Sequence, residues 1–190
     1  MNIQLTWDLF ILVFFVVIVA YSLIIGRGNT LKVILGTYVA ALAADAFGNI
    51  FGASLAGSPL FGEMLTSTSM ASEPEAIVFI KVLAFVGLII LFAVKGAFEV
   101  NTDETKPAAI RLILSFIYAA LSAGLIISVI LVFMSGVSFV GGGSTETTTT
   151  ALWGLSNQSR LIGMILNNIY IWFAVPALAF VFHSFYVGKE

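Results

Sequence analysis

Cysteine is absent from this chain of 190 residues, and histidine occurs once. Without thiols there can be no disulfide, no thiolate chemistry and no iron–sulfur ligation, and a single imidazole does not supply the ligand set of a zinc site. Charged residues make up only 9% of the chain, with a formal net charge of −2. No basic patch is present that would bind nucleic acid. We therefore expect no cofactor, no metal and no nucleic-acid partner.

Apolar residues take the place of the missing charges. They make up 60% of the chain, and the mean hydropathy is +1.10, which lies outside the range of soluble domains. The apolar runs are continuous rather than alternating, which excludes the pattern of an outer-membrane β-barrel. The sequence therefore predicts an all-α, polytopic integral membrane protein that forms a single helical bundle.

Five apolar stretches are long enough to cross a bilayer, which takes about 20 residues. Their predicted bounds are residues 9–25, 32–55, 75–100, 111–138 and 161–187. The first is expected to be retained, because its only preceding charge is Asp8, whereas a signal peptide begins with positive charge. Gly26-Arg27-Gly28-Asn29 separates the first two spans, and Asn29 or Thr30 is suited to cap the second. Since this connection is short, we expect the first two spans to pack antiparallel.

The distribution of basic residues predicts an orientation, since cytoplasmic loops carry an excess of Lys and Arg. Six of the eight basic residues flank the ends that five alternating spans would bring to one side. These are Arg27, Lys32, Lys95, Lys106, Arg111 and Lys189. Lys81 and Arg160 lie on the other side. The bias predicts an N-terminus outside and a C-terminus in the cytoplasm.

The second span carries the features around which the bundle is expected to form. Asp45 and Asn49 lie inside its apolar run, and an ionisable residue within a span normally faces protein or water. Small residues recur every four positions along the same helix, which lets a neighbouring backbone approach closely. This helix-packing stripe consists of Ala40, Ala44, Gly48 and Gly52. The span is therefore predicted to be a buried helix.

Two environments are open for Asp45. At about 1.5 Å per residue, Asp45 lies roughly 15 Å and Lys81 roughly 8 Å below the same surface, so the two could pair across the second and third helices. Alternatively, Asp45 is protonated and donates a hydrogen bond to a hydroxyl or to Asn49, one turn away. The group is then either a structural lock or a proton or cation site, since intramembrane carboxylates often mark ion pathways.

The last span contains Asn168, Trp172 and Pro176 on one face. Pro176 removes a backbone donor and frees the carbonyl of Trp172, which predicts a kink at this point. A kink of this kind serves either packing or gating. Asn168 and Pro176 therefore join Asp45, Asn49 and Lys81 as candidates for a structural or ion-pathway role.

The N-terminal part resembles a known family. Asp8 before an apolar span, Gly26-Arg27-Gly28 in a tight cytoplasmic turn, and a second span rich in Ala and Gly are similar to the start of the colicin V production protein family. The similarity covers about the first fifty residues. That family resembles a four-span scaffold with a polar tail, whereas the final segment here is hydrophobic. The resemblance implies a protein of the bacterial inner (plasma) membrane with a role in export or membrane homeostasis, and it implies no catalytic residues.

Two classes of function fit these observations. The first is a non-catalytic membrane scaffold or assembly subunit of a bacterial envelope complex, surrounded by membrane lipids and bound to other membrane subunits or to copies of itself. The alternative is a subunit of an oligomeric ion or proton channel or transporter that uses Asp45. Five spans are few for a complete secondary transporter, and no inverted repeat is visible. The alternative therefore also requires an oligomer or partner subunits.

Overall fold

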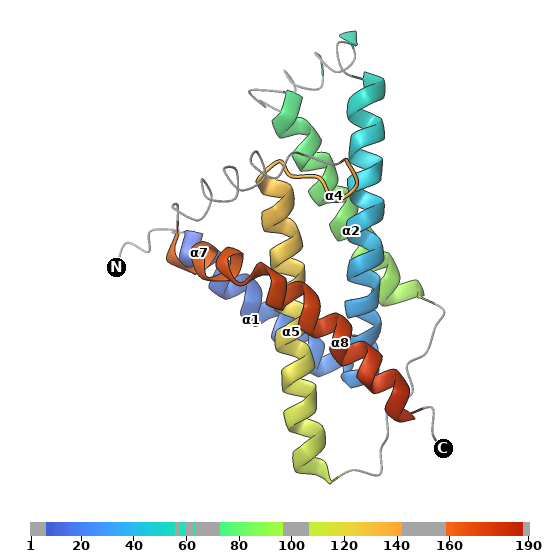
Figure 1. Cartoon of the computed structure of the whole chain (residues 1–190), viewed down its shortest axis with the longest axis vertical. Helices are drawn as coiled ribbons and strands as arrows, with labels where there is room; N and C mark the ends of the chain where they lie inside the picture. Colours follow the sequence, from blue (N-terminus) through green and yellow to red (C-terminus); the bar gives the residue numbers. More distant parts are fainter. Residues whose placement is uncertain are drawn as a thin grey trace.

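The computed structural model describes residues 7–55, 58, 59, 63, 73–96, 107–141 and 159–187. Within these residues the chain forms six α-helices and no strand, which confirms the all-α prediction (Figure 1). The helices are α1 (Trp7–Ile25), α2 (Arg27–Leu55), α4 (Glu73–Lys95), α5 (Ala108–Met134), α7 (Arg160–Asn167) and α8 (Ile169–Val187). The predicted end of the third span at residue 100 lies outside the described residues.

Four of the helices, α1, α2, α4 and α5, are each long and apolar enough to cross a membrane. The bent pair of α7 and α8 adds a fifth candidate span if it counts as one. Only 11% of the most apolar window of α1 and of α4 is buried within the bundle, against 72% for α5. Apolar helices with so much exposed surface require a hydrocarbon environment. The fold is therefore that of a multi-pass helical bundle suited to a membrane.

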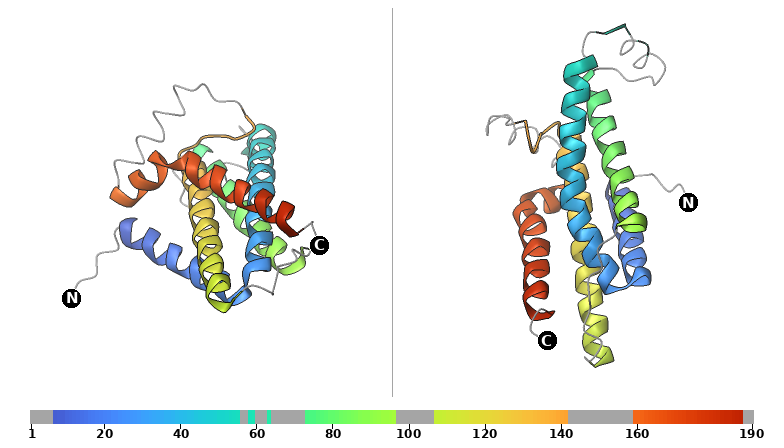
Figure 2. Two further views of the ribbon diagram at one scale, coloured as in Figure 1. Left: turned by 60° about the horizontal axis from the view of Figure 1, so that its bottom comes forward. Right: turned by 90° about the vertical axis from the view of Figure 1, so that its right-hand side faces the viewer.

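The centre of the bundle is formed by α2 and α5. The most extensive contact joins α2 to α4, while α1 packs mainly against α5. Helices α1 and α8 lie on opposite sides of α5 (Figures 1 and 2). The main core draws on α2, α4 and α5 and includes the edge-to-face pair of Phe85 and Phe133, whose ring centroids are 5.7 Å apart. The first two spans, which were expected to pack against each other antiparallel, make only a minor contact, because α1 packs chiefly against α5.

A single residue connects α1 to α2. Gly26 has a φ of +82°, which glycine adopts readily, and α2 begins directly at Arg27. The Thr30 hydroxyl lies 2.9 Å from the carbonyl oxygens of both Ser22 and Gly26, and the Asn29 amide donates to a carbonyl in the last turn of α1. These side chains donate to carbonyls of α1 and of Gly26 instead of accepting from α2 amides. The predicted cap at Asn29 or Thr30, and with it the later helix start at residue 32, is wrong.

The fourth predicted span is shorter than expected. α5 ends at Met134 rather than near residue 138. Gly136 has a φ of +75°, and its N–H donates to the carbonyl of Phe133. A glycine in the left-handed region just past the last helical turn is a common helix stop. Residues 135–141 therefore leave the helix and form a turn.

The last predicted span, 161–187, is broken into two helices. α7 ends at Asn167, and α8 continues at an angle of 56° to it. The break lies at Asn168, whose side chain donates to the carbonyl of Met164 at 2.8 Å. Pro176 lies within α8, which runs to Val187. The 56° bend therefore lies at Asn168, eight residues before Pro176, and the kink expected at Pro176 stays a prediction.

The helices alternate in direction along the chain. α1, α4 and α8 end, and α2 and α5 begin, toward the lower part of Figure 1. Four basic residues belong to these termini, namely Arg27 and Lys32 at the start of α2, Lys95 at the end of α4, and Arg111 in the first turn of α5. The basic residues of the described helices therefore gather mainly at one end of the bundle.

Candidate functional site

The small-residue stripe of α2 is fully inside the bundle. Ala40 and Ala44 have no exposed surface, and Gly48 and Gly52 are also buried. A Cβ atom placed on Gly48 would lie 2.3 Å from Cγ of Lys81, and one on Gly52 would lie 2.8 Å from a side-chain carbon of α4. Such distances are far below ordinary contact, so a larger residue at either position would force its neighbour on α4 to move. The close approach brings the stem of Lys81 across the face of α2.

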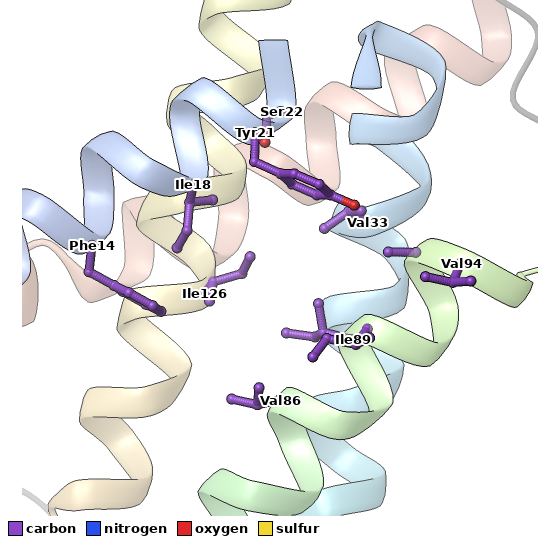
Figure 3. Close-up of a pocket in the computed structure, with 11 residues that line it drawn as sticks. Phe14, Ile18, Tyr21, Ser22, Val33, Val86, Ile89, Val94 and Ile126 are labelled. Carbon is purple, nitrogen blue, oxygen red and sulfur yellow. The ribbon is translucent and has the colours of Figure 1, made fainter. Parts of the chain in front are cut away.

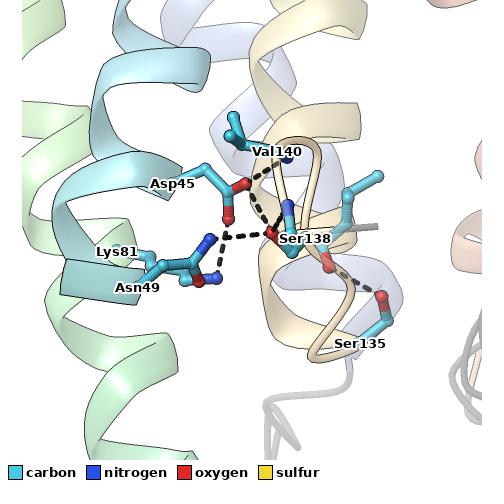
Figure 4. Close-up of polar contacts among 8 residues, drawn as sticks. Asp45, Asn49, Lys81, Ser135, Ser138 and Val140 are labelled. Atoms are coloured by element: carbon cyan, nitrogen blue, oxygen red, sulfur yellow. Dashed lines mark hydrogen bonds and ion pairs between the residues drawn. The ribbon is translucent and has the colours of Figure 1, made fainter. Parts of the chain in front are cut away.

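The ammonium group of Lys81 meets Asp45 in a buried ion pair (Figure 4). Lys81 Nζ lies 2.6 Å from Asp45 Oδ1, and the side chains are 6% and 0% exposed. This is the first of the two environments that the sequence left open. Removing either charge would leave the other buried without compensation, which is costly in a low-dielectric interior.

The other oxygen of Asp45 is held by the turn that follows α5. Asp45 Oδ2 accepts hydrogen bonds from the Ser138 hydroxyl at 2.7 Å and from the Val140 backbone N–H at 2.8 Å. Ser138 Oγ in turn accepts from Asn49 Nδ2 at 2.9 Å and from the Gly141 N–H at 2.7 Å. Asn49 thus reaches the site through Ser138 rather than through Asp45. We call this group, from Asp45 and Lys81 to Ser138 and Val140, the Asp45 junction.

Ser138 and Val140 were not found by sequence reasoning, which assigned residue 138 to a helix. The signal that would have found them is Gly136, a glycine directly after a long apolar helix. The turn at Gly136 folds the following residues back toward α2 (Figure 4). A serine in such a turn can reach a neighbouring helix that it could not reach from the helix itself.

The Asp45 junction satisfies both carboxylate oxygens with donors from α4 and from the turn after α5. Charge-assisted hydrogen bonds of this kind are short and strong. In the part of the chain that the structure describes, no group of three or more His, Cys, Asp or Glu residues could hold a metal ion. The Asp45 junction therefore joins three segments, namely α2, α4 and the turn after α5.

A second polar contact ties α2 to α8. The Tyr38 hydroxyl donates to the backbone carbonyl of Phe173 at 2.5 Å, and the two rings lie edge to face with centroids 6.5 Å apart. One residue earlier, Trp172 packs so closely on α5 that a Cβ atom on Gly124 would lie 2.0 Å from its ring. α8 is therefore held against both central helices in the segment just before Pro176.

Asn168 and Pro176 occupy different environments, although they were predicted to share a face. Pro176 is fully buried inside α8. Asn168 is exposed, and its amide caps the end of α7 by donating to Met164. The structure thus associates Pro176 with packing and Asn168 with the break between the two helices. Neither residue contacts the Asp45 junction through a hydrogen bond among those described.

A third polar contact joins the first turns of α1 and α7. Asp8 Oδ1 accepts from the Ser159 hydroxyl and, at 3.0 Å, from the Leu161 N–H. Ser159 is also the N-cap of α7, since its Oγ accepts from the Ile162 N–H at 3.2 Å. A carboxylate at a helix N-terminus is favoured by the helix dipole. Asp8 entered the predictions only as the charge before the first span and as part of a resemblance, and the sequence gave no sign of this contact.

Comparison with protein-family models, with curated proteins and with solved structures found no match. The resemblance to the colicin V production protein family therefore stays a prediction. The class that the fold itself defines is a helical bundle with several candidate transmembrane helices.

Proposed function

We propose that this chain is a non-catalytic scaffold or assembly subunit of a complex in the bacterial inner membrane, with a role connected with export. The observation that carries the proposal is the Asp45 junction. Its carboxylate and ammonium groups are buried and engaged with each other, and the remaining oxygen is held by Ser138 and Val140. A site that binds and releases an ion needs a ligand position that the ion can enter and leave, whereas a scaffold needs contacts that stay fixed.

The distribution of exposed surface supports the same proposal. α5 is largely covered and α2 is half covered, while α1 and α4 turn most of their apolar surface outward. A rigid centre with broad apolar faces suits a subunit that packs against other membrane proteins or against copies of itself. The resemblance of about the first fifty residues to the colicin V production protein family is the reason for naming an envelope role linked to export.

We further propose that the N-terminus lies outside and the C-terminus in the cytoplasm. The gathering of Arg27, Lys32, Lys95 and Arg111 at one end of the bundle supports this orientation. A fluorescent reporter fused after Lys189 should fold and fluoresce, while a phosphatase that is active only outside the cytoplasm should remain inactive there. The reverse pattern of the two reporters would overturn the orientation.

An oligomeric ion or proton channel or transporter subunit is the second candidate. It is favoured by the presence of Asp45 and Lys81 within helices of membrane-spanning length, because intramembrane ionisable residues often belong to ion pathways. In this case the ion pair would have to open during transport. The turn that carries Ser138 would then be the segment that moves.

Purification from native membranes in a mild detergent separates the two candidates. A defined complex with other membrane proteins supports the scaffold. Homo-oligomers that pass ions in liposomes contradict it, provided that the flux disappears in the variant Asp45→Asn/Lys81→Met, which keeps the site neutral. An exposed-residue variant, Leu91→Ala, serves as the matched control, because Leu91 lies on α4 with 56% of its surface exposed.

A further inference from the structure

An apolar groove runs between α1 and α4, with α5 as its floor. Its larger part has a volume of about 570 Å³ and reaches Trp7 and Glu75, in the first turns of the two helices. Its smaller part has a volume of about 190 Å³ and reaches Tyr21, near the end of α1. Phe14 and Val86 line both parts, so the two parts lie next to each other along the same two helices. We call it the α1–α4 groove.

The groove exists because its two walls are held by different partners. α1 packs mainly against α5, whereas α4 packs mainly against α2. Figure 3 shows the smaller part, where Phe14 and Ile18 of α1 stand opposite Val86 and Ile89 of α4, with Ile126 of α5 between them. Since α1 and α4 are candidate membrane spans, molecules of the bilayer reach this groove from the side.

The size and lining of the larger part fit a flexible apolar ligand. Its volume of about 570 Å³ lies within the roughly 300–1,000 Å³ that small-molecule sites occupy. One wall is preformed by aromatic rings, since Trp7 and Phe10 meet edge to face at 6.3 Å and Phe10 stacks on Phe14 at 6.0 Å. The remaining lining residues are aliphatic side chains and Met134, apart from Phe79 and the carboxylate of Glu75.

The types of lining residue favour an acyl chain over a partner helix. Transmembrane helices associate through small residues that let their backbones approach, as α2 does toward α4 through Gly36, Gly48 and Gly52. The described residues that line the larger part of the groove include neither glycine nor alanine. Its walls are large and irregular, and a flexible chain fills such a space better than a rigid helix.

The charge at the end of the groove selects the headgroup. Among the residues that the structure describes, Glu75 is the one charged residue that lines the larger part. A carboxylate attracts an ammonium group and repels a headgroup with net negative charge. We propose that the α1–α4 groove binds one acyl chain of a phospholipid whose headgroup carries a primary amine, with the amine at Glu75. Phosphatidylethanolamine has this chemistry. The proposal rests on the groove and its membrane environment, and it stands or falls separately from the scaffold role.

Native mass spectrometry of the purified full-length chain tests the proposal. After removal of bound lipid, phosphatidylethanolamine or phosphatidylglycerol with the same acyl chains is added back. The wild-type protein should retain one phosphatidylethanolamine, and phosphatidylglycerol should bind about tenfold more weakly, a difference of about 1.4 kcal/mol. Equal retention of the two lipids would overturn the assignment of the headgroup.

Two substitutions on the same helix test the position of the acyl chain. Val86→Trp fills the junction of the two parts of the groove and should lower lipid retention at least about tenfold. Leu91→Trp is the matched control, because Leu91 is exposed and lines neither part, and it should retain lipid as the wild type does. Unchanged retention in Val86→Trp, or equal loss in both variants, would overturn the proposal. If Val86→Trp does not give a monodisperse protein, Ile130→Phe fills the floor of the larger part and is read in the same way.

The headgroup contact is tested at Glu75. Glu75→Gln should reduce phosphatidylethanolamine binding to the level of phosphatidylglycerol, whereas Glu75→Asp should keep most of the preference because it keeps the charge. A preference that survives Glu75→Gln contradicts the proposed contact. Cross-linking of a co-purified membrane protein to Phe79 or Val82 in the groove, with no lipid retained, would show a helix-binding surface and would also contradict the proposal.

Discussion

Replacing one member of the buried Asp45–Lys81 pair should destabilise the bundle more than replacing both. Asp45→Asn keeps the size of the side chain and one oxygen for Ser138 and Val140, but leaves the Lys81 ammonium without a counter-charge. Lys81→Met leaves the carboxylate with two donors and no cation. Since both side chains are almost fully buried, each single change should lower the free energy of unfolding by about 3–5 kcal/mol.

The double variant Asp45→Asn/Lys81→Met removes both charges at once. One amide donor of the new asparagine then lacks an acceptor, which costs about 1–3 kcal/mol. The two single losses of unfolding free energy sum to roughly 6–10 kcal/mol. The loss in the double variant should therefore be smaller than this sum by about 3 kcal/mol or more. A shortfall of this size is the energetic signature of a direct interaction between the two side chains.

The free energies are measured by titration of purified protein in mixed micelles with sodium dodecyl sulfate, with helix content followed by circular dichroism. Lys95→Met is the matched control, because Lys95 is an exposed lysine on the same helix, and it should change stability by less than about 0.5 kcal/mol. The reasoning fails if either single variant stays within about 1 kcal/mol of the wild type, or if the single losses add without a shortfall.

Three further substitutions are measured in the same way. Gly48→Val should cost about 1–3 kcal/mol, because the valine side chain would overlap the stem of Lys81. Gly87→Ala adds a carbon in open space and should be neutral or stabilising. Equal effects of the two variants would contradict the close packing at Gly48. Tyr38→Phe removes the hydroxyl that donates to α8 and should cost about 1 kcal/mol. A cost near zero would show that this hydrogen bond does not stabilise the fold. Ser159→Ala removes both the N-cap of α7 and the hydrogen bond to Asp8, and it should cost about 1–3 kcal/mol. Amide exchange should be faster in α7 and in the first turn of α1, and equally faster exchange across α8 would argue against a local effect.

The existence and approximate positions of the helices were predictable from hydropathy alone. A chain with so few charges has long apolar runs, and each run of sufficient length predicts one helix. The pairing of Asp45 with Lys81 was also open to sequence reasoning. Counting residues places the two roughly 15 Å and roughly 8 Å below the same surface, and the long side chain of lysine can bridge such a difference. A charged residue inside an apolar run has few possible partners. For this reason only two environments were open for Asp45, the ion pair with Lys81 or a protonated carboxyl group.

The contacts that complete the site were not predictable from periodicity, because they depend on where helices stop. α5 stops at Met134 since Gly136 can adopt a positive φ, and the turn behind it delivers Ser138 to α2. In the last span the sequence predicts a kink at Pro176, but a helix can accommodate a proline when neighbouring groups satisfy the freed carbonyl. The break occurred instead at Asn168, whose short amide side chain bonds to the preceding turn of α7.

The Asp45 junction also bears on how the protein is made. Lys81 follows Asp45 by 36 residues and Ser138 follows it by 93. At about 5–20 residues per second, the ribosome delivers these partners roughly 2–7 s and 5–19 s later. A lone carboxylate in the middle of an inserted helix costs about 2.5–3.5 kcal/mol. Release of α2 into the bilayer is therefore most favourable together with α4, once Lys81 can pair with Asp45. The segment after α5 adds its hydrogen bonds to this ion pair later.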